Sequence, residues 1–189
     1  MLIVPNIGNV FDLLLENTCD AVIVFAKYGY TCMETDWKIF LKKISVNEDE
    51  FTRIGSSYKS HHSIPIIVNI NSEKKYVYFL RNEQNEDCIS DSRLVLQLTA
   101  AIKTLQLIGC KSIGFTGARP TNYLPGLPDD KLEIKNRKKT HNDKAYRERV
   151  DLILDLLYSY NGQSPNNLKI HLISRNDVFT RSILAPINI

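Results

Sequence analysis

The chain has 189 residues, of which 43% are apolar and 24% are charged, and its formal net charge is +3. This length and composition suit a globular domain with a filled core, so a wholly disordered chain is excluded. The net charge is too small to identify a nucleic-acid-binding protein by itself, and no apolar run approaches the roughly 20 residues of a membrane span.

The first half of the chain alternates strand and helix signals. Short apolar runs rich in β-branched and aromatic residues predict strands, and apolar residues spaced three and four apart predict helices. In chain order we expect a strand at Met1–Val4, a helix at Val10–Glu16, a strand at Ala21–Ala26, a helix at Glu34–Ile44, and strands at Ile64–Ile70 and Lys75–Leu80. The run AVIVFA is apolar at every position, which is typical of an inner strand covered on both faces.

The second half continues this alternation with longer helices. A helix is predicted at Asp91–Ile108, and Gly109 stands where a glycine commonly ends a helix. A strand at Ser112–Thr116, a long loop, a helix at Asn142–Tyr160 and a strand at Leu168–Ser174 follow. Since parallel neighbours need such crossovers, we predict one α/β domain over residues 1–189: a three-layer α/β/α sandwich with a mixed, mostly parallel sheet.

The N-terminus and the cysteines indicate a cytoplasmic protein. The first residues include Asp12 and Glu16 but no basic start and no small-residue cleavage site, so a signal peptide is not expected. The four cysteines form no CxxC pair and are expected to be reduced structural thiols. His61 and His62 are adjacent, so on a strand they would point to opposite faces; we expect neither a metal site nor a cofactor.

The loop after the fifth predicted strand, Phe115–Asp130, is the main candidate for a binding site. In folds of this kind ligands bind at the carboxyl ends of the strands. Gly117 allows a ligand to approach backbone N–H groups, and Arg119 offers a fork-shaped donor for phosphate or carboxylate. Tyr123 can stack on a base or a sugar face. The alternative is a surface turn made rigid by proline.

Several stretches of the chain resemble macro domains. Gly8-Asn9-Val10 resembles the family's Gly-Asp-Ile, and Asp20–Val24 resembles the strand that follows it. LQLIGCKSIGF, Leu105–Phe115, is similar to the family's helix end and next strand, and the loop Thr116–Pro128 stands where the family's phosphate-holding loop lies. The segment Glu34–Leu80 looks more like the macro-type N-terminal domain of leucine aminopeptidases, without their metal-binding peptidase half.

This resemblance implies a site for a nucleotide or ADP-ribose, in which Asn9 would hold a base edge and the backbone after the fifth strand would hold phosphates. Its candidate residues are Gly8, Asn9, Val10, Thr116, Gly117, Ala118, Arg119, Asn122 and Tyr123. The usual hydrolysis of ADP-ribose linkages is not expected, because Val24–Gly29 lacks the family's asparagines and has a single glycine. Asn9 also replaces the family's Asp, so catalytic residues stay unassigned.

One stretch of the chain concentrates positive charge. Lys131–Arg149 holds eight basic residues against three acidic ones. Its first part has low hydrophobicity, so we predict a mobile basic loop at about 129–143. It is interpretable as a solvated face, as a flap over an anionic ligand, or as a patch for nucleic-acid phosphates. Nucleic acid is not favoured, because Tyr146 is the only nearby aromatic platform.

Three functional hypotheses follow from these features. We favour a binding module for a nucleotide or an ADP-ribose-like anion. The second is a non-catalytic domain that keeps the fold and binds a protein partner. The third is a divergent hydrolase acting on ADP-ribose-type or nucleotide substrates, in which Arg119 and Asp20 would take part. No membrane partner is expected.

Overall fold

Six strands form one mixed sheet in the computed structural model, which describes residues 1–26, 37–47, 65–81, 89–116, 122–161 and 167–174. The strands are β1 (Leu2–Ile7), β2 (Ala21–Ala26), β3 (Ile66–Ile70), β4 (Glu73–Arg81), β5 (Ser112–Thr116) and β6 (Lys169–Ser174). They lie side by side in the order β1-β6-β5-β2-β4-β3. Only the β3–β4 pair is antiparallel, so the mixed, mostly parallel sheet expected from the sequence is confirmed.

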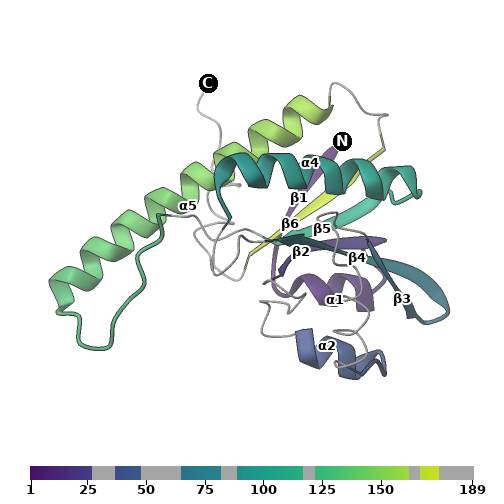
Figure 1. The fold of residues 1–189 in the computed structure, drawn as a ribbon, viewed down its shortest axis with the longest axis horizontal. Helices are drawn as coiled ribbons and strands as arrows, with labels where there is room; N and C mark the ends of the chain where they lie inside the picture. Colours follow the sequence, from purple (N-terminus) through teal and green to yellow (C-terminus); the bar gives the residue numbers. More distant parts are fainter. Residues whose placement is uncertain (27–36, 48–64, 82–88, 117–121, 162–166, 175–189) are drawn as a thin grey trace.

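Helices cover both faces of this sheet (Figure 1). One face carries α1 (Val10–Leu15) and α2 (Trp37–Lys43), and the other carries α4 (Asp91–Leu107) and α5 (Leu132–Asn161). This is the predicted three-layer α/β/α sandwich. Among the helices that the structure describes, none is both long and apolar enough to cross a membrane.

Alternation along β2 shows how the sheet joins two separate cores. Ala21, Ile23 and Phe25 point into the core under α4 and α5. Val22 and Val24 point into the core under α1 and α2. Because successive side chains of a strand lie on opposite faces, an all-apolar strand is needed wherever both faces are covered.

The long basic segment is helical, and the predicted loop at about 129–143 is wrong. α5 begins at Leu132 instead of Asn142. Lys, Arg and Glu are good helix formers, and an ion pair one turn apart joins Arg137 Nη2 to Glu133 Oε1 at 2.6 Å. The C-terminal half of α5 runs beside α4, and its N-terminal half extends away from the sheet (Figure 1).

A buried arginine fixes α5 where it leaves the body of the domain. Arg149 is 2% exposed. Its Nη2 donates to the Ile89 carbonyl oxygen at 2.8 Å, and its Nη1 lies 3.1 Å from a carboxylate oxygen of Asp91, the first residue of α4. The projecting half of α5 therefore starts from a firmly held point on α4.

Candidate functional site

The carboxyl ends of β1 and β5 lie at the same edge of the sheet, on either side of β6. Ile7 at the end of β1 pairs with Ser174, and Thr116 at the end of β5 pairs with Ile173. Neighbouring strands lie about 4.8 Å apart, so the two strand ends are separated by roughly 10 Å. The fold therefore places Gly8–Val10 and Thr116 at one edge, which is where ligands bind in such sheets.

The residues after β1 form a short cap on α1. Asn9 has an extended backbone, and its Oδ1 accepts a hydrogen bond from the Phe11 N–H at 3.0 Å. Gly8 has φ +142°, a conformation that favours glycine, and no neighbouring atom lies within 4 Å of where its Cβ would be. Val10 is 2% exposed, so its side chain belongs to the core and only its backbone remains for a ligand.

Three expected ligand contacts, Gly117, Ala118 and Arg119, lie outside the residues that the structure describes. The same holds for the pair His61-His62 and for Lys27–Gly29 after β2. Much of the segment that resembles leucine aminopeptidases is also outside this range, so that likeness stays a prediction.

Asn122 and Tyr123 lie beside the projecting half of α5. The Asn122 carbonyl oxygen is 2.7 Å from Nε2 of His141, so this ring nitrogen carries the proton that it donates. The Tyr123 ring packs edge-to-face on Tyr146, with ring centroids 5.9 Å apart and planes at 72°. These two expected ligand residues are therefore positioned by α5.

The rest of this loop is also attached to α5. Asn142 Oδ1 accepts from the Leu124 N–H at 2.8 Å, and its Nδ2 donates to the Leu124 carbonyl at 2.9 Å. Lys138 donates to the Pro125 carbonyl at 3.0 Å and to the Asp130 carboxylate at 2.7 Å. The bond from Lys138 lowers the pKa of Asp130, which keeps this carboxylate charged. Residues 122–130 thus form a loop tied to successive turns of one helix.

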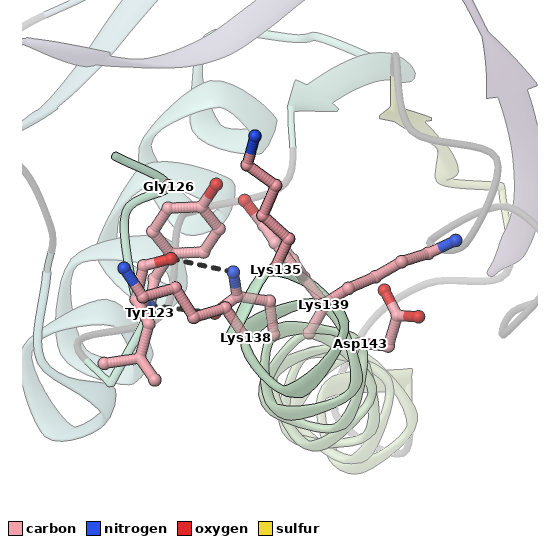
Figure 2. Close-up of a pocket in the computed structure, with 9 residues that line it drawn as sticks. Tyr123, Gly126, Lys135, Lys138, Lys139 and Asp143 are labelled. Carbon is pink, nitrogen blue, oxygen red and sulfur yellow. Dashed lines mark hydrogen bonds between the residues drawn. The ribbon is translucent and has the colours of Figure 1, made fainter. Parts of the chain in front are cut away.

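A cavity of about 430 Å³ opens between this loop and α5 (Figure 2). It is lined by Tyr123, Leu124, Gly126, Lys135, Lys138, Lys139, Asn142, Asp143 and Tyr146. Three lysines and a single carboxylate make its lining cationic. Sequence reasoning missed this cavity because it treated one wall as a loop. The spacing of Lys135, Asn142 and Tyr146 would have placed them on one side of a helix, had the segment been assigned as helical.

The structure contradicts a catalytic role for Asp20 at the ligand-binding edge. Asp20 precedes β2 and therefore lies at the opposite, amino-terminal edge of the parallel strands. Its carboxylate accepts hydrogen bonds from the backbone N–H groups of Lys111 at 2.8 Å and Ser112 at 2.9 Å. Its role is to join the starts of β2 and β5.

No family model and no curated protein matches the chain by sequence. Solved structures match it by fold. The Trypanosoma brucei macrodomain in complex with ADP aligns with a TM-score of 0.61 at 13% identity, over 96% of this chain and 69% of that one. The same macrodomain in complex with ADP-ribose gives 0.60 at 13% identity, over 96% and 68%. The macrodomain of Mycobacterium tuberculosis DarG gives 0.53 at 10% identity, over 93% and 99%. The fold of this chain is therefore that of a macrodomain.

Proposed function

We propose that this chain is a binding module for ADP-ribose or a closely related nucleotide-like anion, at the edge formed by Gly8–Val10 and Thr116. The observation that carries the proposal is the macrodomain fold, which aligns with a T. brucei macrodomain in complex with ADP and with ADP-ribose. Gly8, which is exposed, and Asn9, which is half-buried, follow the carboxyl end of a parallel strand, and ligands commonly bind there in such sheets.

Asn9 is the side chain proposed to select the base. Its Oδ1 accepts from the Phe11 N–H, and a carboxamide carries both the acceptor and the donor atoms that read a base edge. A neutral amide forms a weaker bond than a carboxylate, since charge-assisted hydrogen bonds are roughly twice as strong. We therefore expect weaker adenine recognition than an Asp at this position would give.

The proposal does not include the usual hydrolysis of ADP-ribose linkages. β2 ends in Val24-Phe25-Ala26, which supplies no amide side chain at the strand end. Asp20, the acid named for a divergent hydrolase, lies at the other edge of the sheet. Among the described residues, Gly8–Val10 and Thr116 offer hydrogen bonds but carry no side chain of the kind that serves as a general acid or base near neutral pH.

Titration calorimetry with ADP-ribose, ADP, AMP and NAD tests the proposal. We expect ADP-ribose to bind, Asn9→Ala to weaken binding about tenfold by removing one hydrogen-bond acceptor, and Asn9→Asp to strengthen it. Asn9→Ser is the matched control, because serine caps the helix but does not reach as far toward a base. A folded protein that gives no heat with any of these ligands at millimolar concentration would remove the proposal, as would an unchanged affinity in Asn9→Ala.

Binding of a protein partner is the second candidate, and one observation favours it. Large apolar side chains are exposed on the loop and the first turn of α5: Leu124 is 41% exposed, Leu127 59% and Leu132 74%. Apolar groups gathered at a projecting end are typical of contact sites. Light scattering measures the molecular mass of the protein over a range of concentrations, alone and mixed with any protein captured in a pull-down. A mass that stays that of the monomer, together with a pull-down that captures no protein, counts against this candidate.

A further inference from the structure

The inner side of α5 changes its chemistry where the helix leaves the domain. In the C-terminal half this side is apolar, and Val150, Ile153 and Leu157 are each 1% exposed. Toward the N-terminus the same side continues as Lys135, Lys139, Asn142 and Tyr146, which line the cavity of Figure 2. A helix face that turns inward is normally apolar. A cationic inner face therefore points to a polar, negatively charged occupant.

The cations on the two sides of this helix are partnered differently. On the outer side, Arg137 pairs with Glu133 at 2.6 Å, and Lys144 lies 3.8 Å from Glu148. Within the part of the chain that the structure describes, Lys135 and Lys139 make no ion pair or hydrogen bond, and Figure 2 shows both side chains extending outward from α5 in different directions. Of the three lysines that line the cavity, Lys138 is bound to the loop and Lys135 acts on Asp130 only at longer range, so the charges of Lys135 and Lys139 remain for a ligand.

The cavity also contains an aromatic pair that the sequence did not reveal. Sequence reasoning found Tyr146 as a lone aromatic residue in the basic segment. The fold brings Tyr123 beside it from the preceding loop, with ring centroids 5.9 Å apart. Both tyrosines line the cavity, and aromatic rings beside lysines are the usual elements of single-strand recognition.

The cavity is held open before any ligand arrives. The two hydrogen bonds between Asn142 and Leu124, and those of Lys138 to the loop, fix one wall against the other. A preformed pocket loses less entropy on binding than a flexible one. Its volume of about 430 Å³ falls in the range of small-molecule sites, about 300–1,000 Å³.

The charge of the whole segment favours a polyanion over a single small anion. Lys131–Arg149 carries eight basic and three acidic residues, although the entire chain has a net charge of only +3. The remainder of the chain is therefore slightly acidic, and the projecting half of α5 is the basic region of a polarised molecule. Basic residues gathered on one projecting helix, of which Arg149 alone is buried, are the electrostatic footprint expected for a nucleic-acid backbone.

We propose that this cavity binds one nucleotide of a single-stranded nucleic acid, with its phosphate on Lys135 and Lys139 and its base against the Tyr123–Tyr146 pair. A single strand suits the site better than a duplex, because its bases are free to leave the strand and enter a pocket. Neighbouring phosphates of the strand would lie along the basic half of α5. This binding does not depend on a ligand at the strand ends.

Fluorescence anisotropy with labelled DNA and RNA strands of about 12 nucleotides tests the proposal. We expect binding of the single strand to exceed that of a duplex of the same sequence. Lys135→Ala combined with Lys139→Ala should weaken binding at least about tenfold and lower the slope of log affinity against log salt by about 1. Tyr123→Leu should weaken binding about tenfold without changing that slope.

The matched control removes the same number of charges from the outer side of the helix. Arg137→Ala combined with Lys144→Ala should weaken binding several-fold less than the inner double variant, because these cations lie on the other side of the helix from the cavity. Equal losses in the two double variants, equal binding of the duplex, no binding at low salt, or equally effective competition by free AMP would each overturn the proposal. ADP-ribose affinity should be the same in both double variants, which separates this site from the one at the strand ends.

Discussion

Gly114 in β5 lies directly under α1, and replacing it tests how that helix is seated. A Cβ at this position would lie 3.2 Å from Leu13 Cδ1, 3.2 Å from Val22 Cγ1 and 3.4 Å from Val10 Cγ2. Val22 is in an inner strand and fully buried, so the side chains of α1 must move. Overpacking of this kind costs about 1–3 kcal/mol, and alanine's smaller unfolded-state entropy offsets about 0.4–1 kcal/mol. We expect Gly114→Ala to lower the free energy of unfolding by roughly 1–2 kcal/mol.

Urea denaturation followed by circular dichroism measures this change, and Tm should fall by about 2–4 °C for each kcal/mol lost. Leu13→Ala removes one of the two closest contacts, so the double variant should recover about 0.5–1 kcal/mol relative to the sum of the single effects. Asn9 begins α1, so the same displacement should weaken ADP-ribose binding. A Gly114→Ala protein as stable as its parent, or strict additivity with Leu13→Ala, would refute this account of the packing.

Two further predictions concern a buried histidine and the loop attached to α5. Burial lowers the pKa of His171, whose unfolded value is about 6.5, so the unfolded chain binds the proton more readily. The free energy of unfolding should therefore fall as the pH drops below about 6.5, by at most about 1.4 kcal/mol per pH unit. Urea titrations at several pH values should show a smaller decline in His171→Gln. An equal decline in the two proteins would contradict the assignment of this pH dependence to His171. Asn142→Ala removes both hydrogen bonds to Leu124 and should cost about 1 kcal/mol locally, so hydrogen exchange at the Leu124 amide should speed up by up to about tenfold; unchanged exchange would mean that other contacts hold the loop.

Strands that are covered on both faces were the easiest to predict from the sequence. Ala21–Ala26 and Ser112–Thr116 match the structure to the residue, because an apolar run bounded by polar residues has little freedom to shift between two cores. α4 is nearly as clear, and Gly109 adopts φ +95° just after it ends. β1, at one edge of the sheet, was harder to predict: it extends to Ile7 instead of ending at Val4, because solvent contact weakens the apolar signal there.

The basic segment could not be assigned from apolar periodicity, because its inner face is not apolar. Lys135, Asn142 and Tyr146 satisfy the helical spacing, but with side chains that bind the loop or line the cavity. Its helical state depends on helix propensity, on ion pairs and on continuation from the docked half of α5.

The position of Asp20 could have been predicted from the direction of the chain alone. A residue that precedes a parallel strand lies at the amino-terminal edge of the sheet, whereas ligands bind at the carboxyl edge.

The projecting half of α5 is stable because it continues a helix that has already been nucleated. Val150, Ile153 and Leu157 dock the C-terminal half, and each residue added beyond them gains a backbone hydrogen bond without a new nucleation cost. The helical turns near Leu132 can therefore unfold locally while the sheet stays folded. A nucleotide in the cavity of Figure 2 should therefore slow the hydrogen exchange that occurs by local opening mainly in residues 132–146. A ligand at the carboxyl ends of β1 and β5 contacts the sheet and α1, so it should slow local exchange there, although either ligand raises global stability with its concentration. These different responses assign any observed ligand to one site or the other.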